Sequence, residues 1–202
     1  GSADAAAVLR LLAAEAGVAL DDPALVGLAL DLGADMPMCL AGRPARVAGI
    51  GERLGLAPRM PALPAVLANP NVPVSTPDVF RARVGGFSSP ADLPQSAPDA
   101  EAVAGLVRAF GNDLTAAACA VAPAVGLTLR ALEALPDTLV AGMSGSGGTC
   151  FALFPTVRVA QSAAAGLRRT APGWWGRAVR LNRQSSIGGP LSSTVLPSGS
   201  ST

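Results

Sequence analysis

Apolar residues near the start of the chain recur at helical spacing. Val8, Leu11 and Leu12 share one face of a helix that Ser2 can cap and that ends near Gly17. Asp22-Pro23 then predicts the start of a second helix, since a capping residue precedes a proline in the first turn. We expect Gly33 to end it in a left-handed conformation. The buried positions predicted for this second helix are Leu25, Leu28, Ala29 and Leu32.

Beyond Gly33 the pattern changes to short apolar runs. Residues 36–40 and 45–50 are predicted as two strands around the turn at 41–44. The proline-rich stretch 58–64 predicts a domain boundary.

The remaining chain alternates strand and helix patterns. We expect strands at 65–68, 138–143, 149–154 and 174–181. Helices are expected to start at Thr76-Pro77-Asp78 and to span 99–110, 113–134 and 157–169. The helix at 113–134 is expected to be capped by Asn112 or Asp113 and to be bent or divided at Pro123. This mixture predicts an α+β fold with helices on one face of an antiparallel sheet.

Composition narrows the classes of protein. Half of the 202 residues are hydrophobic, which argues against a disordered chain. The net charge is +1 and the basic residues form no run, which argues against a nucleic-acid partner. No segment is apolar and long enough for a membrane span, so we expect a soluble cytoplasmic protein. The three cysteines fit no metal or disulfide spacing. The uncharged, Ser- and Gly-rich stretch 184–202 predicts a disordered tail.

Three motifs carry candidate chemistry, and each has a plainer alternative. The helix start at Gly1-Ser2-Ala3 can hold an anion, or it is only a helix cap or cloning remnant. Asp35, just past a helix end, is placed to act on a substrate hydroxyl, or it only satisfies turn amides. The loop Ser144-Gly145-Ser146-Gly147 can form a nest of amides around an anion, or it is a tight turn.

In this order the motifs resemble the GHMP kinase superfamily. The residues that carry the resemblance are Gly1-Ser2-Ala3-Asp4-Ala5-Ala6, Leu32-Gly33-Ala34-Asp35-Met36-Pro37, Gly49-Ile50-Gly51-Glu52-Arg53-Leu54, the run 69–80 (NPNVPVSTPDVF), Asn112-Asp113-Leu114, and Met143-Ser144-Gly145-Ser146-Gly147. Together they cover residues 1–182. Within the superfamily they favour the kinases that phosphorylate a cytidine-diphosphate-bearing methylerythritol in the non-mevalonate isoprenoid pathway.

The resemblance implies a ribosomal-protein S5-like lobe, of which residues 1–60 are the remnant, and a ferredoxin-like lobe at 61–182, followed by the tail at 183–202. It implies ATP and Mg²⁺ as cofactors, with no metal ligand assigned to this chain. By this resemblance Asp35 is the catalytic aspartate, Gly1, Ser2 and Ala3 end the ATP loop, and the loop at 144–147 closes over the transferred phosphoryl group. Phe80 is implied to stack on the cytosine ring, with core packing as its alternative. Ser75 and Thr76 are implied substrate contacts, with helix capping as theirs.

The sequence departs from the family pattern in one chemical respect. The family pairs its aspartate with a lysine, and all fifteen basic residues here are arginine. The resemblance therefore predicts an N-terminally truncated chain that does not turn over by itself. Another small-molecule GHMP kinase, of homoserine or mevalonate-pathway type, and a non-catalytic binding module remain the alternatives. Both a monomer and a homodimer are compatible with the sequence.

Overall fold

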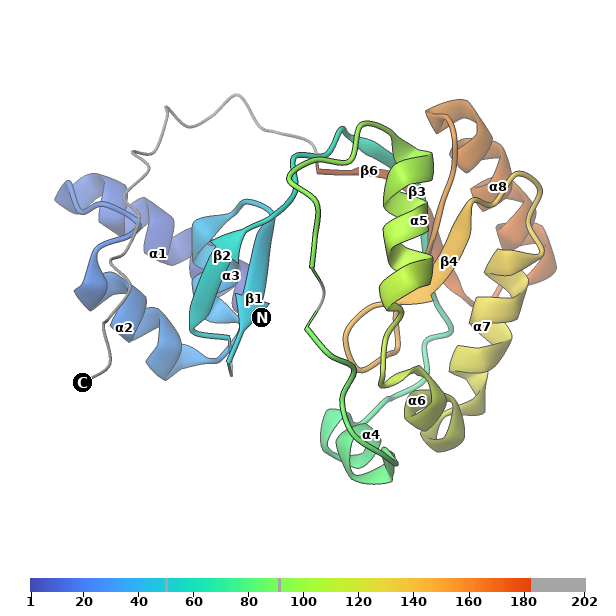
Figure 1. The fold of residues 1–202 in the computed structure, drawn as a ribbon, viewed down its shortest axis with the longest axis horizontal. Helices are drawn as coiled ribbons and strands as arrows, with labels where there is room; N and C mark the ends of the chain where they lie inside the picture. The colour runs from blue at the N-terminus through green and yellow to red at the C-terminus, as the bar shows by residue number, and fades with distance from the viewer. Residues whose placement is uncertain (50, 91, 183–202) are drawn as a thin grey trace.

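The fold is described from a computed structural model of the chain, over residues 1–49, 51–90 and 92–182. The predicted disordered tail at 183–202 lies outside the described residues. Figure 1 shows two groups of elements joined by the segment between β2 (Arg53–Leu56) and β3 (Leu63–Asn69). The more extensive contacts between described elements all lie within one group or the other.

The first group contains three helices and a hairpin. They are α1 (Ser2–Ala16), α2 (Pro23–Leu32), α3 (Met36–Ala41), β1 (Ala45–Ala48) and β2 (Arg53–Leu56). Both α1 and α2 pack on α3, and β1 pairs antiparallel with β2. The core of this group is small. It consists of Ala6, Leu9, Ala29, Met36 and Leu40.

Local signals place the first two helices as the sequence predicts. Gly17 ends α1 in the left-handed conformation, and the Asp22 carboxylate accepts a hydrogen bond from the amide of Ala24 at the start of α2. Two details were wrong. Gly1, not Ser2, is the N-cap of α1, and Gly33 ends α2 at φ 157° and ψ 151°, outside the left-handed helical region.

The predicted apolar face of α1 was also wrong. Val8, Leu11 and Leu12 are 54%, 69% and 59% exposed, because the helix instead turns Leu9 and two alanines toward α3. On α2, Ala29 is buried as predicted, whereas Leu28 and Leu32 are exposed. Small residues allow the close approach of the helices, so the bulkier face is left outside the core.

Residues 36–40 form helix α3 and not the predicted strand. Pro37 lies in the first turn of the helix, where its missing N–H costs nothing, and Met36 and Leu40 meet on one buried face at i, i+4 spacing. The strand predicted at 45–50 is shorter, and its partner is β2 instead of the 36–40 segment.

The second group is built on a four-stranded antiparallel sheet with strand order β4-β5-β3-β6. The strands are β3 (Leu63–Asn69), β4 (Val140–Met143), β5 (Cys150–Leu153) and β6 (Trp175–Leu181). The helices are α4 (Thr76–Ala82), α5 (Ala100–Phe110), α6 (Thr115–Val121), α7 (Pro123–Glu133) and α8 (Val157–Thr170). The predicted α+β class is confirmed, and so is the division of the 113–134 helix at Pro123.

Helices cover both faces of this sheet, which corrects the prediction of a single covered face. Val66 and Ala68 of β3 belong to a core cluster with α6, α7 and α8, while Leu63 and Ala65 belong to a cluster with α5. In Figure 1, α5 lies on one side of the strands and α7 and α8 on the other. Since successive side chains of a strand point to opposite faces, the nearly continuous burial of β3 follows.

Candidate active site

The glycine-rich segment at 144–149 is a closed loop between β4 and β5. The amide of Ser144 donates to the carbonyl of Thr149 at 3.0 Å, and the amide of Gly147 donates to the carbonyl of Ser144 at 3.1 Å. Gly145 and Gly147 have φ of +56° and +115°, which residues with a side chain rarely adopt. The glycines are therefore required by the turn itself.

Two amides at the tip of the loop have no partner. Among the described residues, the N–H groups of Gly145 and Ser146 make no hydrogen bond. Gly145 is exposed and Ser146 is half-buried. Neighbouring free amides of this kind form a concave site for an anion, so the loop suits a phosphate group as well as a turn.

Helix α4 lies beside this loop. The hydroxyls of Thr76 and Ser146 are hydrogen-bonded to each other at 2.7 Å, which joins the first residue of α4 to the loop tip. Of the predicted site residues, these two come from segments 70 residues apart and are brought into direct contact.

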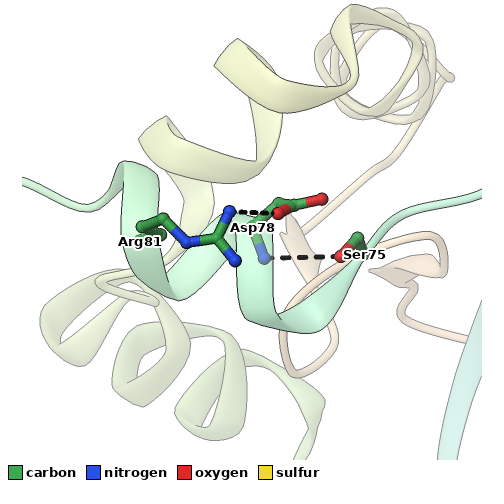
Figure 2. A network of polar contacts seen from close by, with 3 residues as sticks. All are labelled: Ser75, Asp78 and Arg81. Atoms are coloured by element: carbon green, nitrogen blue, oxygen red, sulfur yellow. Dashed lines mark hydrogen bonds and ion pairs between the residues drawn. The ribbon is translucent and has the colours of Figure 1, made fainter.

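The start of α4 is locally braced, as Figure 2 shows. The Ser75 hydroxyl accepts a hydrogen bond from the amide of Asp78, and Arg81 forms an ion pair with the Asp78 carboxylate. The Ser75 hydroxyl and the Arg81 guanidinium hold the pKa of Asp78 below its usual range. The capping explanation for Ser75 is thus confirmed, and it leaves the Thr76 hydroxyl directed to the loop.

Phe80 does not serve as a core residue. Its side chain is 50% exposed, while the preceding Val79 is fully buried against the core. Core packing, the alternative interpretation of Phe80, is excluded by this exposure. The ring is available for stacking, and cytosine stacking remains a prediction.

Asp35 is the residue just before α3, and its exposed carboxylate makes no cap hydrogen bond. Its backbone position is held from two sides. The Arg10 guanidinium donates to the carbonyl of Cys39 at 3.0 Å, tying α1 to α3. Gly51 is pressed against Ala34 so closely that a Cβ at position 51 would overlap the Ala34 carbonyl oxygen. A side chain at position 51 would therefore displace the residue next to Asp35.

Gly1, Ser2 and Ala3 form the exposed start of α1. The Gly1 carbonyl accepts hydrogen bonds from the amides of Asp4 and Ala5, and the Gly1 ammonium pairs with the Asp4 carboxylate at 2.7 Å. The structure shows a capped helix start, and its role toward ATP stays a prediction.

The predicted site residues thus form two sets. Gly1, Ser2, Ala3 and Asp35 belong to the first group of elements, and the loop with α4 belongs to the second. In the described part of the chain, no hydrogen bond or ion pair joins one set to the other.

Two asparagines that the sequence suggested only as turn or cap residues also contact the loop. The Asn112 amide donates to the carbonyls of Met143 and Gly145, and the Asn69 amide donates to the Thr149 hydroxyl. The positions of these two asparagines within the family motifs were the only signal in the sequence, but a turn or capping role explained those positions equally well.

No cluster of three or more His, Cys, Asp or Glu side chains that could hold a metal occurs among residues 1–182 apart from positions 50 and 91. Over the same described residues, no helix is long and apolar enough to cross a membrane.

Comparison with known families identifies the second group. Residues 97–173 match the family model for the GHMP kinases C terminal. The chain carries a GHMP kinase C-terminal domain. The match runs from the start of α5 to the turn before β6, so it includes the glycine-rich loop and Asn112.

Two curated relatives extend the similarity to the first group. A protein of Gluconacetobacter diazotrophicus is 47% identical over 176 residues, covering 87% of this chain and 57% of the relative. One of Rhodospirillum rubrum is 45% identical over 181 residues, covering 90% of this chain and 60% of the relative. Both are named 4-diphosphocytidyl-2-C-methyl-D-erythritol kinase.

A crystal structure of 4-(cytidine 5'-diphospho)-2C-methyl-D-erythritol kinase has the same fold, with a TM-score of 0.68 and 35% identity over 88% of this chain and 63% of that one. The resemblance stated from the motifs is confirmed. The chain spans 57% and 60% of the length of the two curated relatives.

Proposed function

We propose that this GHMP kinase chain serves the ATP-dependent phosphorylation of the 2-hydroxyl of 4-diphosphocytidyl-2-C-methyl-D-erythritol, in the non-mevalonate isoprenoid precursor pathway. One observation supports this most strongly. The loop with free amides at Gly145 and Ser146 is hydrogen-bonded to the helix that presents the exposed Phe80 ring. Phosphate-binding and base-stacking groups are what a cytidine-diphosphate ligand requires.

In this proposal the two groups of elements are the two lobes of the kinase, with the boundary near residue 60. The Phe80 ring stacks on cytosine, Thr76 and Ser75 contact the substrate, and the loop at 144–147 holds the phosphoryl group in transfer. Gly1, Ser2 and Ala3 hold ATP phosphates. Positioning and neutralisation of charge supply most of the catalysis in such a transfer.

Asp35 is proposed to orient the substrate hydroxyl and to accept its proton as the oxygen attacks the γ-phosphorus and ADP leaves. Its exposed carboxylate, free of a capping hydrogen bond, is compatible with that role. Since the described residues provide no cluster of metal ligands, we propose that Mg²⁺ arrives with ATP, and we assign it no step.

The first test is ligand binding by the 202-residue chain. We expect CDP to bind, and Phe80→Ala to weaken binding about fivefold or more, because a base–aromatic stack contributes about 1–3 kcal/mol. Isothermal titration calorimetry measures both. Phe110→Ala, a second partly exposed phenylalanine on α5, is the matched control and should bind CDP as the parent chain does.

Turnover is the second test. The chain contains no lysine to pair with Asp35, so we expect binding without measurable phosphoryl transfer by these 202 residues. Turnover that Asp35→Asn abolishes would show that the lysine is dispensable. Failure of CDP to bind, or equal binding by Phe80→Ala and the parent chain, would remove the cytidine assignment.

A further inference from the structure

Asn112 connects the glycine-rich loop to the start of α6. Its side-chain amide donates to the Met143 carbonyl at 3.1 Å and to the Gly145 carbonyl at 2.8 Å. Its side-chain oxygen accepts a hydrogen bond from the amide of Leu114 at 2.9 Å. One half-buried side chain therefore donates to the end of β4 and to the loop, and accepts from the N-cap residue of α6.

We propose that Asn112 is a positioning residue for the anion-binding amides of the 144–148 loop. The nature of the bound anion rests on the proposed function, whereas the hydrogen bonds of Asn112 do not. Because the peptide bond is planar, a hydrogen bond to a carbonyl oxygen also fixes the direction of the next N–H. The Gly145 carbonyl and the Ser146 N–H belong to one rigid trans peptide and point in opposite directions. When Asn112 holds the carbonyl oxygen, the Ser146 N–H is turned away from Asn112.

The peptide at the base of the loop is oriented in the same way. The Met143 carbonyl and the Ser144 N–H share a peptide plane, and the Ser144 N–H donates to the Thr149 carbonyl, which closes the loop. Asn112 thus orients the peptide that closes the loop and the peptide at its tip.

Other side chains hold the loop without setting the direction of its amides. Asn69 donates to the Thr149 hydroxyl at 3.1 Å, and Thr76 is bonded to the Ser146 hydroxyl. Both contacts end on side chains of the loop. Among the described residues, Asn112 is the side chain that binds the loop's main-chain carbonyls.

Two substitutions separate this role from the hydrogen bond that Asn112 accepts from the amide of Leu114, the N-cap residue of α6. Asn112→Asp keeps the oxygen that accepts from Leu114 and removes both donors. Asn112→Ser also keeps a side-chain oxygen and is neutral, so it controls for the added charge. The matched control is Asp99→Asn, which exchanges a carboxylate and an amide at the N-cap of α5, at a position distant from the loop in the sequence.

The experiment is ¹⁵N relaxation and amide exchange on the full 202-residue chain. In Asn112→Asp and Asn112→Ser we expect the order parameters of Gly145 and Ser146 to fall from about 0.85 to below about 0.6. We expect the hydrogen-bonded amides of Ser144 and Gly147 to exchange about tenfold faster. The α6 amides and the melting temperature should stay as in the parent chain, and Asp99→Asn should leave the loop unchanged.

Unchanged loop dynamics in both variants, or faster exchange in α6 to the same extent as in the loop, would overturn the proposal in favour of a role limited to the hydrogen bond with the Leu114 amide. Inorganic pyrophosphate is the ligand probe, and Asn112→Ser should weaken its binding about tenfold. If the loop loosens as expected but the parent chain binds neither pyrophosphate nor CDP, the positioning role stands and the proposed function fails.

Discussion

The two groups of elements bury their apolar residues to very different extents. In the second group, seventeen buried residues form one cluster around Val66, Phe154 and Leu132, and α5 closes a further cluster on the opposite sheet face. In the first group, five residues form the core, and bulky side chains such as Leu11, Leu12 and Leu56 stay exposed.

This difference shows that amphipathic helices alone do not make a core. The starts of α1 and α2 were predicted from local signals, yet several of their larger apolar side chains, among them Leu11, Leu12 and Leu32, have no surface to pack on within the described chain. The helices of the second group are packed around a sheet. We infer that the free energy of folding resides mainly in the second group, because buried apolar area dominates stability.

The largest expected effect comes from truncating the core of the second group. Phe154 is fully buried, and Phe154→Ala should lower the free energy of unfolding by about 3–5 kcal/mol through lost burial and the cavity left behind. Urea denaturation followed by circular dichroism measures the change.

Leu12→Ala is the counterpart in the first group. Because Leu12 is exposed, we expect its truncation to change the free energy of unfolding by less than about 0.5 kcal/mol. A loss comparable to that of Phe154→Ala would mean that the apolar face of α1 is covered in solution, and the comparison between the groups would fail.

Cysteine reactivity provides a second, kinetic comparison. Burial, with a smaller contribution from Cys119, raises the pKa of the Cys150 thiol to about 11, so little of it is thiolate at pH 8. Cys39 in the first group is only half-buried. We expect iodoacetamide to modify Cys150 about a hundredfold more slowly than Cys39, as measured by mass spectrometry of the peptides.

The control for this prediction is the chain in guanidinium chloride, where both thiols should react at similar rates. Equally fast modification of Cys39 and Cys150 under native conditions would show that the core of the second group opens as readily as α3 does.

The smallest expected effect lies within the second group. The Ser88 hydroxyl and amide donate to the Asp113 carboxylate at 2.6 and 2.8 Å, and with the charge of Arg83 they lower the pKa of Asp113. A lowered carboxyl pKa stabilises the fold above the ordinary value of about 3.9 and loses that contribution as pH falls through the lowered value.

We therefore expect Asp113→Asn to reduce the melting temperature slightly at pH 7 and to match the parent chain once the pH lies below the lowered pKa of Asp113. Thermal denaturation across this range measures it, with Asp31→Asn on the exposed side of α2 as the control. A difference between Asp113→Asn and the parent that persists unchanged at low pH would exclude the ionised carboxylate as the cause.

Most element boundaries could be predicted because their signals are local. Asp22-Pro23, Ser75, Asp99 and Pro123 act within one turn of the helix that they begin, and all four appear at helix starts in the structure. The order of motifs, from Asp35 to the loop at 144–147, was enough to indicate the family.

What the tertiary structure decided depends on residues far apart in the sequence. Residues 36–40 form a helix because Met36 and Leu40 have α1 and α2 to pack on, and the buried face of α1 was chosen by close packing and not by side-chain size. The donors of Asn112 reach a loop more than thirty residues away, which no local pattern encodes. The sequence by itself indicated the family and most elements of the second group, whereas packing determined that residues 36–40 are helical, which apolar faces are buried and which groups meet at the loop.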